Sequence, residues 1–145
     1  GTLAGDVAAV ALTALSCVTL GRLLAAVTPA AALKAGVVVM AAIDAYLVFS
    51  DLLQGPNATL VAAAPPGGAP QLQFAGLGRA SLGYGDLFVA GVLGGVLAAE
   101  RRRQLPAAAL VLVLATAFDL LFWVVDELPA TVPVAVALLI CEARR

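Results

Sequence analysis

The chain has 145 residues, 63% of them hydrophobic and only 12% charged, and its mean hydropathy is +1.06. Soluble domains carry about 25% charged residues, so this composition excludes an ordinary soluble domain and predicts an integral membrane protein in a lipid bilayer. The lack of histidine excludes histidine-based proton relays, and no basic patch with interleaved aromatic residues points to nucleic acid as a partner.

Five apolar stretches predict membrane-spanning helices, because a bilayer core needs about 20 mostly apolar residues per helix. They cover residues 7–27, 30–53, 81–99, 105–125 and 130–141. The first has no basic segment before it, so we interpret it as a span and not as a signal peptide. Cys17 and Cys141 lie in apolar stretches and are expected to be small buried hydrophobes without a disulfide. The sequence therefore predicts one all-α domain, residues 1–145, built as a polytopic transmembrane helix bundle.

Basic residues set the expected orientation of the five spans. Seven of the eight lie near the turn at residue 28, near the loop at residue 101 or at the C-terminus, and only Arg79 lies on the other side. Since positive charges favour the cytoplasmic side, we expect the C-terminus in the cytoplasm and the N-terminus with the 54–80 loop outside. The run Arg101-Arg102-Arg103 is interpreted as a topology anchor.

Residues 54–80 form the one long polar connection between predicted spans. Residues 58–62 make a short apolar run, and an alternating run typical of a strand follows the Pro/Gly-rich residues 65–70. The alternating residues are Gln71, Leu72, Gln73 and Phe74. The two runs predict a small β-hairpin at the membrane surface, and the alternative is an unstructured linker.

Two aspartates lie in apolar stretches, where a carboxylate costs several kcal/mol and needs a partner. Asp44 lies in the second span, and Asp86 lies near the start of the third, in Gly83-Tyr84-Gly85-Asp86. Each is the expected partner of the other. The two glycines lack side chains, which lets a substrate backbone or a neighbouring helix approach Asp86 closely. Asp119 is interpreted as a helix-packing or water-contacting residue, and Asp51 as a solvated one.

Two carboxylates that share a site do not both ionise easily, so the pair holds one proton between them. The ionised carboxylate takes a proton from water while the protonated one hydrogen-bonds the carbonyl oxygen of an amide. This chemistry hydrolyses a peptide bond without a metal or a cofactor, and neither is expected here. The alternative for the same two residues is a structural hydrogen-bonded pair or an ion-coupling site.

At these residues the chain resembles the GxGD intramembrane aspartyl proteases of the presenilin and signal-peptide-peptidase family. Gly83-Tyr84-Gly85-Asp86 matches the GxGD motif, Asp44 stands where the family has the aspartate of its Tyr-Asp motif, and Leu128-Pro129-Ala130 matches the start of its Pro-Ala-Leu motif. The order of the motifs agrees over roughly residues 28–145. The resemblance implies catalysis by Asp44 and Asp86 on transmembrane peptides. It also implies active-site support from Gly83, Tyr84, Gly85, Leu128, Pro129 and Ala130.

The chain departs from the family pattern in three places. Ile43 replaces the tyrosine of Tyr-Asp, Thr131 replaces the leucine of Pro-Ala-Leu, and five spans stand where the family usually has nine. These five correspond to the last five, the catalytic C-terminal half. The expected orientation resembles that of signal peptide peptidase, which implies substrates whose N-terminus lies in the cytoplasm. An edge strand at residues 71–75 is expected to hold the unwound substrate by β-augmentation.

Two other functions stay open. A prepilin-peptidase-like protease also uses GxGD, although such enzymes usually have a lysine soon after the aspartate, where this chain has Leu87, Phe88 and Val89. The remaining alternative is an ion- or proton-coupled transporter or an inactive membrane scaffold. A transporter is expected to show repeat symmetry, and we find no internal repeat in the sequence.

Overall fold

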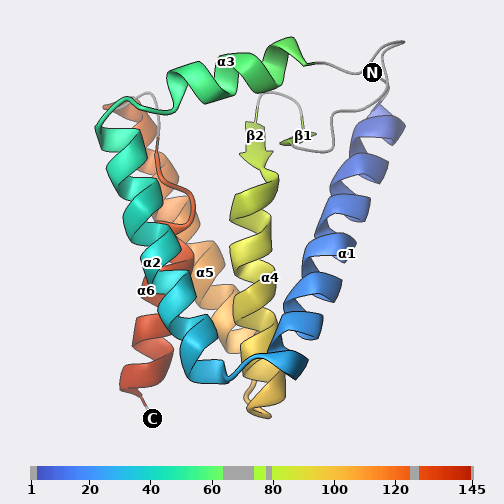
Figure 1. Cartoon of the computed structure of the whole chain (residues 1–145), viewed down its shortest axis with the longest axis vertical. Helices are drawn as coiled ribbons and strands as arrows, with labels where there is room; N and C mark the ends of the chain where they lie inside the picture. The colour runs from blue at the N-terminus through green and yellow to red at the C-terminus, as the bar shows by residue number, and fades with distance from the viewer. Residues whose placement is uncertain (1–2, 64–73, 78–79, 125–127, 145) are drawn as a thin grey trace.

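The computed structural model describes residues 3–63, 74–77, 80–124 and 128–144. Five helices run alternately up and down between the two ends of the molecule (Figure 1), namely α1 (Leu3–Val27), α2 (Ala30–Phe49), α4 (Tyr84–Ala99), α5 (Gln104–Asp119) and α6 (Val132–Ala143). A shorter helix, α3 (Gln54–Ala62), lies across one end, and a 3-10 turn, η2 (Leu120–Trp123), follows α5. The prediction of a helical fold is confirmed for the described residues.

The helices differ in length from the predicted spans. Two of them, α1 with 25 residues and α2 with 20, are long and apolar enough to cross a membrane. The other three are apolar but shorter, with 16 residues in α4, 16 in α5 and 12 in α6. The third and fifth predicted spans begin too early, because residues 81–83 form a strand and α6 starts only at Val132.

The second predicted span ends too late, because α2 stops at Phe49. Asp51 has a left-handed φ of 55°, its N–H donates to the Val48 carbonyl (3.1 Å), and the N–H of Leu52 donates to the Leu47 carbonyl (3.1 Å). This is a Schellman ending, in which a left-handed residue turns the following N–H groups back onto unpaired carbonyls of the last turn. α4 ends in the same way at Arg101, whose φ is 53°. Neither ending uses glycine, so the end of α2 carried no glycine stop signal, whereas the predicted third span ends at Ala99 as α4 does.

α4 is the central helix of the bundle and packs against α1, α2, α5 and α6. Five of its side chains are buried, namely Val89, Val92, Leu93, Val96 and Leu97. The same core takes Val37 and Ala41 from α2, Ala107 from α5, and Val134, Ala135 and Leu138 from α6. The start of α4, which carries the GxGD motif, is therefore attached to the most buried element of the fold.

The closest helix packing joins α1 to α4. The buried residues of α1 recur every four positions, at Ala9, Thr13, Cys17 and Gly21. A Cβ added to Gly91 would lie 2.7 Å from the carbonyl carbon of Cys17, and one added to Gly95 would lie 2.6 Å from that of Gly21. Real Cβ atoms do not approach a backbone this closely. Small residues at four-residue spacing are a common means of close helix contact in membranes, and here they let the two backbones touch.

A cluster of ion pairs links three helices at the end of the bundle that carries the α1–α2 turn. Lys34 lies 2.6 Å from Glu100 and 3.1 Å from Glu142, and Arg102 pairs with both glutamates. Arg102 also donates to the Cys141 carbonyl at 2.5 Å. Lys34 belongs to α2, Glu100 follows α4, and Glu142 belongs to α6. Arg102 therefore ties helices together, a role that its interpretation as a topology anchor missed.

A two-stranded antiparallel hairpin precedes α4, and it differs from the predicted one. β1 (Phe74–Leu77) pairs with β2 (Ala80–Gly83), with Phe74 opposite Gly83. Residues 58–62, predicted as one flank of the hairpin, belong to α3, and β2 comes from residues predicted to end the loop and begin the third span. β1 lies against α1, and β2 leads directly into the GxGD turn. Gln71, Leu72 and Gln73 lie outside the described residues, so their role stays a prediction.

Candidate functional site

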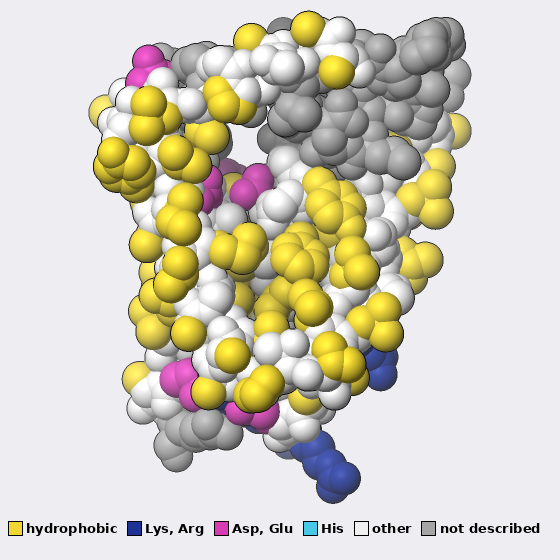
Figure 2. Space-filling model, in the orientation of Figure 1, with side chains coloured by type: hydrophobic (Ala, Val, Ile, Leu, Met, Phe, Trp, Pro, Cys, Tyr) yellow, Lys and Arg dark blue, Asp and Glu magenta, His cyan; other side chains and the backbone are white. Residues whose placement is uncertain are grey.

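Asp44 and Asp86 line one small cavity of about 240 Å³. α2 contributes Met40, Ile43, Asp44 and Leu47 to its wall, α4 contributes Gly85 and Asp86, and Thr131 precedes α6. Both aspartates are half-buried, and their negative charges repel one another. Figure 2 shows acidic side chains gathered at an opening beside α2 and beneath α3. Because a water occupies about 30 Å³ in the liquid, the cavity has room for several.

Asp44 is held by the residue that begins α6. The hydroxyl of Thr131 donates to Asp44 Oδ2 at 2.5 Å, and the backbone N–H of Thr131 donates to the same oxygen at 3.3 Å. Thr131 is only 4% exposed, so these bonds lie away from bulk solvent. No hydrogen bond reaches Asp44 Oδ1 from the described residues, which leaves that oxygen available to water.

Asp86 is held by its own helix. It is the third residue of α4, and its Oδ2 accepts a hydrogen bond from the N–H of Gly83 at 3.2 Å. A carboxylate at this position also interacts favourably with the positive end of the helix dipole. The contact gives Asp86 a structural role as half of a capping box, but it uses one oxygen. The other oxygen accepts no hydrogen bond within the described part of the chain.

Tyr84, the variable residue of the GxGD motif, ties this turn to α1. Its hydroxyl shares a hydrogen bond of 2.8 Å with the hydroxyl of Ser16, and its carbonyl accepts a weak bond from the thiol of Cys17 at 3.9 Å. Ser16 and Cys17 lie on the face of α1 that packs against α4. The position of Asp86 therefore depends on α1 as well as on α4.

The two motif glycines meet different surroundings. A Cβ added to Gly85 would meet no atom within 4 Å among those described, so no neighbouring helix approaches it and the space beside it stays open. A Cβ added to Gly83 would lie 3.1 Å from Asp86 Oδ2. The two glycines were expected to leave room near Asp86 for another backbone. At Gly85 the space is open, as expected, whereas at Gly83 the side chain of Asp86 fills it.

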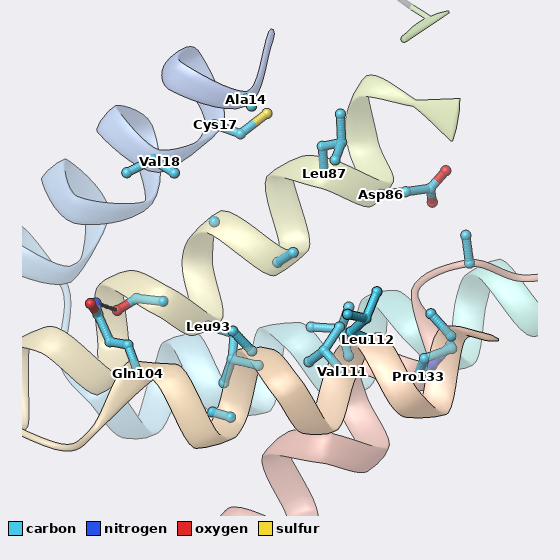
Figure 3. Close-up of a pocket in the computed structure, with 18 of the residues that line it drawn as sticks. Ala14, Cys17, Val18, Asp86, Leu87, Leu93, Gln104, Val111, Leu112 and Pro133 are labelled. Carbon is cyan, nitrogen blue, oxygen red and sulfur yellow. Dashed lines mark hydrogen bonds between the residues drawn. The ribbon is translucent and has the colours of Figure 1, made fainter. Parts of the chain in front are cut away.

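Asp86 also lines a second and larger cavity, of about 1410 Å³ (Figure 3). This cavity lies between α1, α4 and α5, and most of its wall is apolar, including Leu87, Leu93 and Val111. Asp119 belongs to the same wall, so the predicted water-contacting residue lies in a cavity that also reaches Asp86. Asp51 is exposed, as expected for a solvated residue.

The predicted Pro-Ala-Leu equivalent also lies near Asp86. Leu128 and Ala130 line the larger cavity together with Asp86, and Pro129 is fully buried. Pro133 is the second residue of α6, where a missing N–H breaks no hydrogen bond within the helix, so it fits the first helical turn. Leu128, Ala130 and Thr131 thus line cavities to which Asp86 also belongs, whereas β1 lies against α1.

Two residues of this site were missed at the level of sequence. Thr131 was counted only as a departure from Pro-Ala-Leu, and Ser16 was one polar residue in an apolar span. Both are hydroxyl residues in otherwise apolar surroundings, which was the available signal. Their partners, Asp44 and Tyr84, lie 87 and 68 positions away in the chain, so only the folded structure identifies the contacts.

The described residues of this site do not form a metal centre. Among the described residues, no group of three or more Cys, Asp and Glu side chains is arranged to hold a metal ion. The two cysteines are free, and Cys17 is buried as expected while Cys141 is half-buried.

Comparison with known proteins identifies no relative of this chain, because no protein-family model, no curated protein and no solved structure matches it.

Proposed function

We propose that this chain is the catalytic core of an intramembrane aspartyl protease of the GxGD type, which hydrolyses peptide bonds within transmembrane segments. The observation that carries the proposal is the single cavity lined by Asp44, Asp86, Gly85 and Thr131. It combines two carboxylates, room for water and an open approach over a glycine. Each carboxylate has one oxygen held by the protein, which fixes its position for reaction with water.

The membrane placement is supported by the outer surface of the bundle. Many large apolar side chains are more than half exposed, among them Leu12, Leu15, Leu23, Val39, Ile43, Phe49, Leu112 and Val113. Figure 2 shows hydrophobic side chains along the whole visible height of the helices. An apolar surface of this extent marks contact with a membrane or a partner, and lipid covers it from all sides at once.

The short helices fit a site below the membrane surface. At 1.5 Å per residue, α4 is about 24 Å long and α6 about 18 Å, against a bilayer core of about 30 Å. Both begin at the aspartate cavity and are preceded by non-helical segments, β2 and residues 128–131. Non-helical backbone at membrane depth is tolerated where it is buried in protein or lines a water-filled cavity. Pro129 is fully buried and Thr131 lines the cavity, so residues 128–131 meet that condition.

The basic residues support an orientation with the C-terminus in the cytoplasm. Lys34, Arg102 and Arg144 all lie at the end of the bundle opposite to the aspartate cavity. A thiol introduced as Arg144→Cys is expected to react with an impermeant reagent only from the cytoplasmic side. If the thiol reacts only from the outside, both the predicted orientation and the predicted preference for substrates with a cytoplasmic N-terminus are wrong.

The proposed reaction starts with one proton on the pair. The ionised carboxylate takes a proton from water as the water oxygen bonds to the carbonyl carbon, and the protonated carboxyl donates to the carbonyl oxygen. The product is a geminal diol. It collapses when the carboxyl that took the water proton gives it to the amide nitrogen and the C–N bond breaks. The other carboxylate, which had donated its proton, takes one back from a hydroxyl of the diol. The larger cavity offers an apolar path along α4 by which a peptide reaches Asp86.

Reporter cleavage in liposomes tests the proposal. The wild-type chain is expected to cut a transmembrane peptide inside its apolar segment, with the cut located by mass spectrometry, and Asp86→Asn is expected to remove this product. Asp51→Asn is the matched control, because Asp51 is exposed and asparagine tolerates its left-handed backbone. A wild-type protein that leaves the peptide intact but carries protons or ions across the liposome would instead support a transporter.

A further inference from the structure

We propose that Thr131 is a positioning residue that keeps Asp44 ionised, so that Asp44 is the general base and Asp86 the general acid. This assignment rests on the proposed protease function for its chemistry. The distinction between the two carboxylates comes from their hydrogen-bond donors, and it does not follow from the GxGD motif.

The hydroxyl of Thr131 does not cap the helix that it precedes. Thr131 precedes α6, and a threonine at this position normally accepts a hydrogen bond from an N–H of the first helical turn. Here its side chain makes no such bond. Pro133 occupies the second position of the helix and has no N–H to offer, so the first turn has one fewer donor to satisfy. The hydroxyl is thereby left to donate to Asp44.

Two donors meet at one oxygen of Asp44. A backbone N–H can only donate, so Asp44 Oδ2 acts as an acceptor toward Thr131, and the hydroxyl bond of 2.5 Å adds a second donor to it. Hydrogen bonds donated to a carboxylate oxygen stabilise its ionised form. Asp86 receives only the N–H of Gly83, at 3.2 Å, from the described residues. The proton that the pair shares therefore resides on Asp86.

Among the residues that the structure describes, no other charged side chain lines the small cavity. Its remaining lining residues are Met40, Ile43, Leu47 and Gly85, none of which titrates. The charged residues of α2, α4 and α6 that form ion pairs lie at the opposite end of the bundle. Asp119 lines only the larger cavity, to which it belongs through α5.

The assignment fixes the direction of each proton transfer. Asp44 takes a proton from water while the water oxygen bonds to the carbonyl carbon, and Asp86 gives its proton to the carbonyl oxygen. In the collapse, Asp44 returns its proton to the departing nitrogen, and a hydroxyl of the diol returns one to Asp86. Thr131 touches neither substrate nor water in this sequence and acts only through Asp44.

Thr131→Val, Thr131→Ser and a pH profile test the assignment. Valine keeps the shape and the backbone N–H but removes the hydroxyl, and we expect kcat to fall about 10- to 100-fold with little change in KM. The acid limb of the pH profile is expected to move to higher pH, because Asp44 then gains a proton more readily. Serine is expected to restore both. A Val variant with the wild-type pH profile, or a Ser variant as impaired as Val, overturns the proposal.

A second measurement requires neither cleavage activity nor a folded Thr131→Val protein. Infrared titration of the carboxyl groups in the wild-type and Thr131→Ser proteins, compared with Thr131→Ala, follows the two protonation steps of the pair. The lower step is expected to move to higher pH only in the variant without a hydroxyl. If the lower protonation step stays at the same pH in Thr131→Ala, the role of Thr131 is overturned, even if the protein cleaves the reporter. If that step moves to higher pH but the wild-type protein cleaves no reporter, only the protease proposal is overturned.

Discussion

Asp44→Asn and Asp86→Asn are each expected to lower reporter cleavage by about 10³-fold or more, and the double variant is expected to be no worse than either single one. The reason is that base and acid act on the same water and carbonyl, so removing one partner leaves the other without a function. Melting temperatures are expected to stay near that of the wild type, since asparagine keeps an oxygen that accepts from Thr131 or Gly83. Single-turnover cleavage in liposomes measures the three variants on one scale.

Asp119→Asn provides the comparison for this prediction. Asp119 lines the larger cavity but not the smaller one, so its loss is expected to have a far weaker effect on cleavage. A double variant far slower than either single variant would mean that the two aspartates act independently. Abolished cleavage in Asp119→Asn would place a third carboxylate in the chemistry.

The sequence predicted the five main helices, but it missed α3 and misplaced several helix ends. Periods of apolar residues identify a helix, whereas an end depends on local hydrogen bonds. The end after Phe49 was misplaced, because it rests on left-handed Asp51 and no glycine marks it. The end after Ala99 was predicted at that residue, and it rests on left-handed Arg101. The start of α4 at Tyr84 was missed for another reason: the β2 residues, Ala80–Gly83, include no charge and no proline, so nothing in their composition separates them from the helix that follows.

The sequence revealed some residues of the candidate site and missed others. Asp44 and Asp86 stood out in sequence because a carboxylate is rare in an apolar stretch, and the cavity places them together. Thr131 and Ser16 did not, because a single hydroxyl is common in membrane helices. The close contact of α1 with α4 was also missed, although its signal was present as Gly91 and Gly95 at four-residue spacing.

Gly91→Ala is expected to destabilise the fold by about 1–3 kcal/mol, although alanine is the better helix former by about 1 kcal/mol. The added Cβ would lie 2.7 Å from the Cys17 carbonyl carbon and 3.3 Å from the Val18 N, both of them backbone atoms that no side-chain rotation can move. α1 must therefore shift away from α4, which also breaks the hydrogen bond between Ser16 and Tyr84 beside Asp86. Denaturant unfolding in detergent micelles measures the stability, and reporter cleavage measures the loss at the site.

Gly94→Ala is the matched control on the same helix. A Cβ at Gly94 meets no described atom within 4 Å, so only the gain in helix propensity remains, and stability is expected to stay level or to rise by up to about 1 kcal/mol. Gly95→Ala should behave like Gly91→Ala, because its Cβ would lie 2.6 Å from the Gly21 carbonyl carbon. Equal stability of the Gly91 and Gly94 variants would mean that α1 and α4 do not touch through their backbones. Tyr84 would then need another anchor to fix Asp86.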